Sequence, residues 1–552
     1  MQTPSRSESS SWPRWAGFAA ALLVLDAALT FVNLWPTPAV WWAGGISIEL
    51  AVCLLTIAVI VARRGSLPAG AIAWLAALWT VLTLARYAEV TAPALYGRDV
   101  NLYWDLRLMP DVAAMIVRVA PLWLAALVVG AAAGVLWLIH RLFRWAFART
   151  AGAIENVSTR RRVGAAAAAV VLIFAAQRLG AAIPAPLPAP VVATWTRQAG
   201  LVLAGWRGTS SLPPSPAMES TFANAGDADV FLVFIESYGA VSDRPDIARQ
   251  LSPGRDRLAA DIRDSRREVV SAYVESPTFG GSSWLAHISL LSGIEVREPD
   301  TNALLMTQRR ETLVNAFARH GFRTVALMPG LRQPWPEGRF YGFDEIYGAN
   351  RLAYAGPEFG WFALPDQFSL AKLDLLEAGA GINERRFIFF PTISTHFPFS
   401  PTPPYQPAWN RIFDAHPWDG PAVVRAYAQQ PDWTHFAPGY VDAVAYTYAT
   451  LAGYLRTHAG RDIVFVILGD HQPAAAVSGE GASWSVPVHV VASRPAILDR
   501  LLARGFHDGL VPARPALCRM HALLPILVDA FGDRQPSAPS SAAERGRAAY
   551  PF

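Results

Sequence analysis

The stretch "DVFLVFIES", residues 229–237, indicates the fold of the later part of this 552-residue chain. Its residues are apolar at successive positions, and it ends on two polar side chains, Glu236 and Ser237. A strand that is apolar on both faces is typical of a parallel sheet with helices on either side. Four later runs have the same form: "RTVALMPG" (323–330), "RFIFFPTIST" (386–395), "DIVFVILGDH" (462–471) and "VPVHVVAS" (486–493).

Segments with helical spacing lie between these runs, for example "ETLVNAFARHGF" (311–322) and "YVDAVAYTYATLAGYLRTHAG" (440–460). Strands that alternate with helices predict an α/β domain with a central, mostly parallel sheet flanked by helices. We expect this domain to cover residues 227–534. The polar, proline-containing segment 535–552 is predicted to be a disordered tail.

The first third of the chain indicates a membrane domain. Only 16% of all residues are charged and 53% are hydrophobic, so a purely soluble protein is not expected. The apolar residues gather in segments of roughly membrane-spanning length, which predict an all-α domain of five spans within residues 1–184. Residues 185–226, with "PAPLPAP" and an amphipathic stretch, predict a linker with an interfacial helix. The five predicted spans are about 15–35, 40–62, 67–87, 119–142 and 163–183.

The arginine residues near these spans predict the orientation. Positively charged short loops stay on the cytoplasmic side, and all three arginine groups share one side if the N-terminus is cytoplasmic. We therefore expect a multi-pass protein of the inner (plasma) membrane, with everything after residue 184 in the periplasm or outside the cell. The three groups are Arg6 and Arg14; Arg63 and Arg64; and Arg141, Arg144, Arg149, Arg160, Arg161 and Arg162.

Charge and cysteine content exclude some classes of function. The formal net charge is only +4, and no basic run with interleaved aromatic residues occurs, so nucleic acid is not an expected partner. The two cysteines, Cys53 in a predicted span and Cys518 in the exported part, are not expected to pair. The sequence gives no signal for an oligomeric state.

Polar residues that follow the predicted strands indicate a metal site. In open α/β sheets, ligands bind at the carboxyl ends of the strands. Glu236 ends the first run, His396 follows the third, and Asp470 and His471 end the fourth. Carboxylate and imidazole groups delivered to one sheet edge form a plausible set of ligands for a divalent metal ion.

A hydroxyl group that could complete this site lies in "SPTFGGSSWLAHISLLSG", residues 276–293. The two glycines allow close backbone approach, and Ser282 or Ser283 is expected at the N-terminus of a helix, where amides and the helix dipole favour a phosphate. A hydroxyl held beside a metal ion is activated as a nucleophile. Thr278 is a third candidate in the same stretch.

The ordered set resembles the alkaline phosphatase and sulfatase superfamily over about residues 227–500. The shared features are a Glu at the end of the first strand, a helix-opening hydroxyl ten residues before a Gly, the His of "THFPF" (395–399) and the late "GDH" (469–471). Five spans before an exported domain resemble the membrane-anchored branch, which includes lipoteichoic acid synthases, phosphoglycerol transferases and phosphoethanolamine transferases.

This resemblance implies roles for individual residues. Glu236, Asp470 and His471, together with the nucleophile, would ligate one divalent ion, with Mn as first choice and Zn or Mg as alternatives. His396 would contact the phosphoryl or leaving group. Counting ten positions back from Gly293 gives Ser283 as the nucleophile, with Ser282 and Thr278 as alternatives.

Departures from the family pattern narrow the subclass. Ser283 is not followed by the x-P-x-R of sulfatases, and Thr392 stands where two-metal members have an Asp four residues before the strand-end His. Two cysteines cannot supply the several disulfides of phosphoethanolamine transferases. In the phosphoglycerol branch a Trp and an Arg bind glycerol phosphate, and "GLRQPWPEGRFYGFDEIYG" offers Trp335 with Arg332 and Arg339. The same Trp335 could equally be loop packing.

The sequence therefore predicts a membrane-anchored, metal-dependent transferase. It would move a phosphoglycerol-type headgroup from a membrane phospholipid to a glycan or lipid acceptor through a phosphoserine. The alternatives are a phosphoethanolamine transferase, a phosphodiesterase or sulfatase-like hydrolase of the same superfamily, and a non-catalytic protein that binds lipid or a partner.

Overall fold

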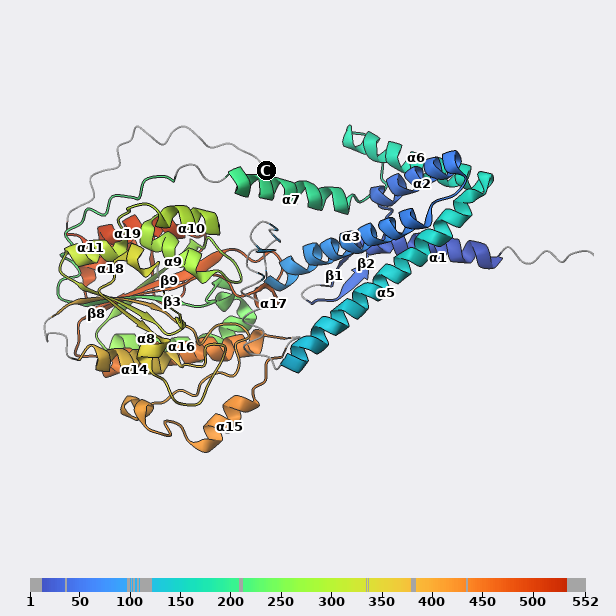
Figure 1. Ribbon diagram of the computed structural model, residues 1–552. Helices are drawn as coiled ribbons and strands as arrows, with labels where there is room; N and C mark the ends of the chain where they lie inside the picture. The colour runs from blue at the N-terminus through green and yellow to red at the C-terminus, as the bar shows by residue number, and fades with distance from the viewer. Residues whose placement is uncertain are drawn as a thin grey trace, which may run out of the picture. The chain divides into compact units, whose positions relative to one another are not determined.

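The computed structural model describes residues 12–34, 37–96, 100, 102, 105–106, 109, 122–207, 212–333, 335, 337–378, 384–432 and 435–533. The predicted tail, residues 535–552, lies outside the described residues. The chain divides into two compact units, residues 1–208 and 209–552, and Figure 1 shows the helical first unit and the α/β second unit.

The second unit is built on a nine-stranded sheet. Its strands follow the order β10-β4-β9-β8-β3-β7-β5-β6, and β11 pairs with β4. Strands β8, β3, β7, β5 and β6 are all parallel to their neighbours within this run. Strand bounds are β3 Asp229–Ile235, β4 Glu268–Glu275, β5 Arg323–Met328, β6 Glu345–Gly348, β7 Arg386–Pro391, β8 Ile463–Gly469, β9 Ser485–Ala492, β10 His507–Asp508 and β11 Cys518–Arg519.

The five predicted strands are present, and the sheet is mixed: five of its strand pairings are parallel and three are antiparallel. β9, expected as a parallel strand, pairs antiparallel with both β8 and β4, and β10 is antiparallel to β4. An antiparallel strand buried on both faces has the same continuous apolar sequence as a parallel one, so periodicity alone cannot give strand direction. β9 lies between β4 and β8 in the interior of the sheet, which explains its run of buried residues.

Helices cover both faces of the sheet (Figure 1). They enclose two apolar cores. The helices α9 (Ser283–Ser292), α11 (Leu313–Arg319), α18 (Pro495–Ala503) and α19 (Leu523–Phe531) contribute buried residues to one core. The helices α8 (Pro245–Asp264), α14 (Asp366–Leu376) and α16 (Ala437–Thr457) contribute to the other. The remaining helices of this unit are α10 (Pro299–Met306), α12 (Gly338–Tyr341), α13 (Ala349–Leu352), α15 (Gly420–Ala428) and α17 (Ala475–Ser478).

Residues 218–226, which the sequence assigns to the linker, pack with the second unit. Met218 and Phe222 are each 1% exposed and belong to the same core as α19. The Phe222 ring stacks on Phe531, with ring centroids 6.0 Å apart. The predicted domain start at residue 227 is therefore too late, because a buried aromatic anchor precedes the first strand.

The first unit contains a helix at each of the five predicted spans. Its helices are α1 (Trp12–Thr30), α2 (Ile48–Arg64), α3 (Ala69–Tyr96), α5 (Leu122–Glu155), α6 (Val157–Arg178) and α7 (Pro190–Arg207), with a hairpin of β1 (Phe31–Asn33) and β2 (Val40–Trp42) after α1. The segment predicted as the second span begins as strand β2, and its helix starts only at Ile48. α7 occupies the stretch expected to form an interfacial helix.

Two of the described helices are long and apolar enough to cross a membrane, Ala69–Ala94 and Ala126–Glu155. The five-span count is therefore not confirmed. α5 also extends through most of the segment predicted as an arginine-rich loop and ends at Glu155, one residue before the N-cap of α6, Asn156. Arginine is a good helix former, so a basic stretch does not by itself indicate a loop.

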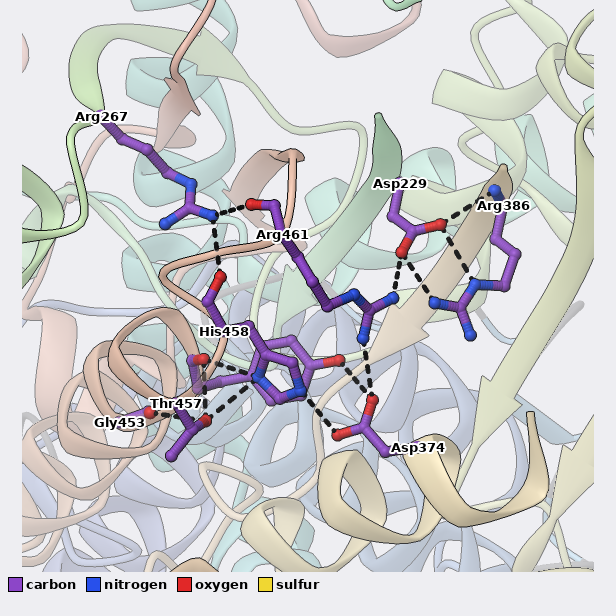
Figure 2. A network of polar contacts seen from close by, with 9 residues as sticks. Asp229, Arg267, Asp374, Arg386, Gly453, Thr457, His458 and Arg461 are labelled. Atoms are coloured by element: carbon purple, nitrogen blue, oxygen red, sulfur yellow. Dashed lines mark hydrogen bonds and ion pairs between the residues drawn. The ribbon is translucent and has the colours of Figure 1, made fainter. Parts of the chain in front are cut away.

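A buried ionic network ties together the sheet edge at which the parallel strands begin (Figure 2). The Asp229 carboxylate at the start of β3 accepts hydrogen bonds from Arg386 Nε (3.1 Å) and Nη2 (2.7 Å), and it also pairs with Arg461. Arg461 reaches Asp374 of α14 (3.3 Å), which His458 contacts at 3.1 Å. This network thus links β3, β7, α14 and the segment before β8.

We predict that Asp229→Asn lowers the free energy of unfolding of the second unit by about 3 kcal/mol, because it leaves the nearly buried Arg386 without its charged partner. The matched control is Asp246→Asn, in which the carboxylate is 60% exposed and pairs with Arg244, and it should cost less than about 1 kcal/mol. Urea denaturation of the detergent-purified protein measures both. Equal losses in the two variants would contradict the structural role of the network.

Candidate metal and phosphoryl-transfer site

The candidate site lies where β3 and β8 end side by side. These strands pair in parallel from Asp229↔Ile463 to Ile235↔Gly469, so the residues that follow them emerge together. Gly469 permits this closeness, since a Cβ there would lie 1.7 Å from the Tyr238 carbonyl oxygen. The edge is the opposite one from the network of Figure 2, because Asp229 begins β3 and Glu236 follows its end.

Four of the predicted residues meet at this edge. Ligand atoms of Glu236, Asp470 and His471 all lie within 4.8 Å of one another. The Ser283 hydroxyl donates to Glu236 Oε2 at 2.8 Å and lies 3.2 Å from His471 Nε2. His471 Nε2 is in turn 3.2 Å from Glu236 Oε1 and 3.8 Å from Asp470 Oδ1. One hydroxyl, one imidazole nitrogen and two carboxylates therefore converge on a small volume.

The chemistry of this donor set fits a single divalent cation. His471 Nδ1 lies 2.7 Å from the Gln472 carbonyl oxygen, which can only accept, so the proton resides on Nδ1 and Nε2 is left as a ligand. The Asp470 and His471 side chains are 1% and 2% exposed, and Glu236 is 12% exposed. Two carboxylates and a neutral imidazole in a buried site match the oxygen and nitrogen preference of Mn, Zn or Mg.

The pKa values at the site reflect strong mutual coupling. Burial raises the pKa of Asp470 well above its usual value, and the neighbouring Glu236 charge raises it further. Burial also opposes ionisation of Glu236, but the hydrogen bond and charge of His471 and the charge of His396 outweigh it and lower its pKa. For His471, burial is outweighed by Asp470 and Glu236, which raise its pKa to about 9. Without a cation, protons on Asp470 and His471 thus compensate the charge of the cluster, and binding of a metal ion would release them.

Ser283 is placed by the first turn of α9. The helix begins at Ser283, and Ser282 before it has left-handed backbone geometry (φ 62°) and an exposed side chain. Gly280 also has a positive φ of 67°, which turns the chain into the helix. Of the three candidate nucleophiles, Ser283 is the one with hydrogen bonds to predicted ligands. Thr278 is 6% exposed, and its hydroxyl has no hydrogen-bond partner among the described residues.

His396 lies beyond the end of β7, the other neighbour of β3. Asp366 holds this segment, since its carboxylate accepts hydrogen bonds from the backbone amides of Ile393 and Ser394, both at 2.9 Å. His396 Nδ1 is 2.7 Å from the Phe397 carbonyl oxygen, which leaves Nε2 free for proton transfer. β7 pairs with β3 up to Phe234↔Pro391, so the segment that carries His396 leaves the sheet beside the residues that follow β3.

Aromatic rings flank His396 on two sides. The Trp361 ring is stacked with it, at a centroid distance of 6.1 Å and an interplanar angle of 23°, and Phe362 meets it edge-on at 5.0 Å. Trp361 is 40% exposed. The sequence interpretation missed Trp361 and Asp366, because nothing in a strand-end pattern marks residues that come from the β6–β7 connection.

The three residues predicted to bind the headgroup, Trp335, Arg332 and Arg339, lie in different environments. Trp335 packs against the apolar core and stacks on Tyr341, with ring centroids 5.2 Å apart, which agrees with the loop-packing alternative. Arg332 is exposed and its Nη2 donates to the Phe362 carbonyl oxygen at 2.7 Å, so it is attached to a residue that flanks His396. Arg339 is exposed on α12.

Ser237 is a further residue at the site that the sequence marks only as a strand end. Its φ is 58°, unusual for a residue other than glycine. In this conformation its backbone amide donates to Asp470 Oδ1 at 2.8 Å and its hydroxyl donates to Glu236 Oε1 at 3.2 Å. Ser237 thereby holds both carboxylates in place.

Comparison with known proteins gives one family match and several similar folds. Residues 294–487 match the family model described as Sulfatase, a segment that includes His396, Asp470 and His471 but begins after Ser283. A search of the curated proteins found no match.

Solved structures with similar folds include the lipoteichoic acid synthase LtaP from Listeria monocytogenes (14% identity, covering 50% of this chain and 69% of that one, TM-score 0.34). Another is the integral membrane lipooligosaccharide phosphoethanolamine transferase A from Neisseria meningitidis (14% identity, 86% and 88%, TM-score 0.44). A third is the Streptococcus pyogenes phosphoglycerol transferase GacH in complex with sn-glycerol-1-phosphate (13% identity, 60% and 91%, TM-score 0.34).

The chain carries a Sulfatase-family domain on an α/β sheet. This match agrees with the resemblance to the alkaline phosphatase and sulfatase superfamily that the sequence motifs indicate.

We predict that Glu236→Gln weakens binding of Mn²⁺ and Zn²⁺ by at least about tenfold, because it removes one of two ligand charges while keeping the side-chain shape. The matched control is Glu480→Gln, which neutralises an exposed carboxylate in the same domain. Isothermal titration of metal-stripped protein gives both affinities. Unchanged metal affinity in Glu236→Gln would show that the cluster is not the binding site.

Proposed function

We propose that this protein is a membrane-anchored phosphotransferase that moves a phosphorylated headgroup, phosphoglycerol as first choice, from a membrane phospholipid to a hydroxyl of a glycan or lipid. The observation that carries the proposal is the Ser283 hydroxyl, which lies within hydrogen-bond distance of both Glu236 and His471 at the N-terminus of α9. This position serves a nucleophile that attacks phosphorus.

The residues that would hold the metal ion are Glu236, Asp470 and His471, with Ser283 as the fourth. When bound there, a divalent cation supplies positive charge that favours the ionised hydroxyl and offsets charge on the phosphoryl oxygens. Mn is our first choice, with Zn or Mg as alternatives.

Before the first step, the Ser283 hydroxyl gives up its proton to solvent through its hydrogen bond to Glu236. The ionised Oγ then attacks the phosphorus of the phospholipid, and the bond from phosphorus to the diacylglycerol oxygen breaks. Diacylglycerol leaves with a proton, and the headgroup phosphate remains on Ser283. The first-turn amides of α9 face the anionic phosphoryl group and stabilise it. His396 Nε2, free because Nδ1 is engaged with Phe397, gives the proton to the leaving oxygen.

In the second step, an acceptor hydroxyl attacks the phosphoserine, and the bond between phosphorus and Ser283 Oγ breaks. His396 Nε2 takes the proton of the acceptor hydroxyl, which restores the starting state of both residues. Attachment to the membrane keeps the site at high effective concentration near its lipid donor. Water in place of the acceptor would make the same site a hydrolase.

The choice of phosphoglycerol over phosphoethanolamine rests on sequence. Cys53 and Cys518 are both free in the structure, so the second unit has no disulfide of the kind expected in phosphoethanolamine transferases. Formylglycine-dependent sulfatase chemistry is disfavoured, because Pro and Arg are missing after Ser283.

The test follows diacylglycerol release from fluorescent phosphatidylglycerol and phosphatidylethanolamine, with Mn²⁺ and then Zn²⁺. We expect Ser283→Ala to lower the rate by at least about 10³-fold, because no other hydroxyl replaces the nucleophile. Ser282→Ala is the matched control, since that side chain is exposed and adjacent, and it should stay within about threefold of wild type.

Release that depends on Ser283 would identify the donor lipid by comparison of the two substrates. Release without transfer to an added acceptor alcohol would indicate the phosphodiesterase alternative. Absence of release from both lipids under both metals would contradict the proposal and favour the non-catalytic alternative.

A further inference from the structure

An apolar groove of about 700 Å³ lies in the first unit, whereas the catalytic cluster belongs to the second. It runs mainly between α2 and α3, and α6 and α7 add single side chains. Among its lining residues, Val52 and Leu78 are each 49% exposed and Trp74 is 80% exposed, so the groove is open along its side. Its lining includes Val52, Thr56, Trp74, Leu78, Leu82 and Phe174.

One carboxylate, Glu49, stands at the end of this apolar groove. Its Oε1 accepts hydrogen bonds from the backbone amides of Val191 (2.9 Å) and Val192 (3.2 Å), which fixes the side chain at the start of α7. Its Oε2 is buried and has no hydrogen-bond partner among the described residues. A buried carboxylate oxygen without a donor is unfavourable, so a ligand that supplies a donor there would be stabilised.

The nearest described cation on α3 is not hydrogen-bonded to this oxygen. Arg86 directs Nε and Nη2 to the Phe31 carbonyl oxygen, at 3.3 and 3.2 Å. Glu49, a lining residue of the groove, therefore keeps Oε2 without a hydrogen bond among the described residues, although the Arg86 charge acts on its carboxylate.

The length of the groove corresponds to one leaflet of a bilayer. Along α2 it extends from Glu49 to Ile60, twelve residues whose eleven steps rise roughly 16 Å at about 1.5 Å each. Half of a hydrocarbon core of about 30 Å is about 15 Å. With the predicted cytoplasmic N-terminus, the Glu49 end of α2 faces the outside, so the groove spans the outer leaflet.

We propose that this groove binds one phospholipid of the outer leaflet whose headgroup carries a hydrogen-bond donor, a hydroxyl or an ammonium. One acyl chain lies in the groove between α2 and α3, and the headgroup donates to Glu49 Oε2. The binding site is separate from the catalytic cluster and does not depend on the proposed transfer reaction.

The experiment uses the full-length protein with Ser283→Ala, so that no substrate is consumed and lipid binding is read independently of catalysis. The protein in detergent is irradiated with phospholipids that carry a photoreactive diazirine on one acyl chain, and labelled peptides are mapped by mass spectrometry. Three headgroups are compared: glycerol with hydroxyls, ethanolamine with an ammonium, and choline with neither N–H nor O–H.

We expect labelling of α2 and α3 peptides with the glycerol or ethanolamine lipid, and about fivefold less with the choline lipid, since a single hydrogen bond is worth about 1 kcal/mol. Val52→Trp, which fills the groove, should lower labelling by a similar factor or more. Val59→Trp is the matched control, because Val59 is on the same helix, is 50% exposed and is not part of the lining.

Glu49→Gln provides a second, independent variant. Its amide oxygen can still accept from Val191 and Val192, but its amide group no longer offers a free acceptor, so the preference over the choline lipid should disappear. Preference for one donor headgroup identifies the lipid. Equal labelling of the Val52→Trp and Val59→Trp variants would overturn the proposal. So would equal labelling by all three lipids in the protein that keeps Glu49.

Discussion

The in-register parallel pairing of β3 with β8 is the constraint on which the candidate site depends. Because Ile235 lies opposite Gly469, the residues that follow both strands leave the sheet at one point. Glu236 and Asp470 are thereby brought together although more than two hundred residues separate them in sequence. Two buried carboxylates repel each other, and the site tolerates them because His471 and the amide and hydroxyl of Ser237 supply compensating hydrogen bonds.

The two edges of the sheet, where the parallel strands begin and where they end, have different roles in the second unit. At the edge where the strands begin, Asp229, Arg386 and Arg461 form a closed ionic network with opposite charges in contact. At the other edge, the carboxylates face a single imidazole and a hydroxyl. At the first edge, the aspartate and arginine charges compensate one another and stabilise the fold. At the second edge, the carboxylates and the imidazole can bind a cation and take part in chemistry.

The sequence predicted those parts of the structure that depend on local pattern. Five apolar runs gave five strands, and strand-end positions identified Glu236, Asp470 and His471, which the structure brings together. It could not give strand direction, so β9 was assigned to a parallel sheet. It also missed β4, which begins and ends on a Glu and has Ser271 within its buried run. Trp361 and Asp366 were also missed, since their contacts with the His396 segment arise from tertiary packing alone.

The measurement that tests the account most directly is chemical mapping of the phosphoenzyme. The detergent-purified protein is mixed with a phospholipid labelled in its phosphate, quenched in acid within one turnover and digested, and the labelled peptide is sequenced by mass spectrometry. The account predicts phosphate on Ser283, because its hydroxyl is the one that contacts Glu236 and His471. Phosphate on Ser282 or Thr278, or turnover without any phosphorylated peptide, would contradict the assignment of the nucleophile.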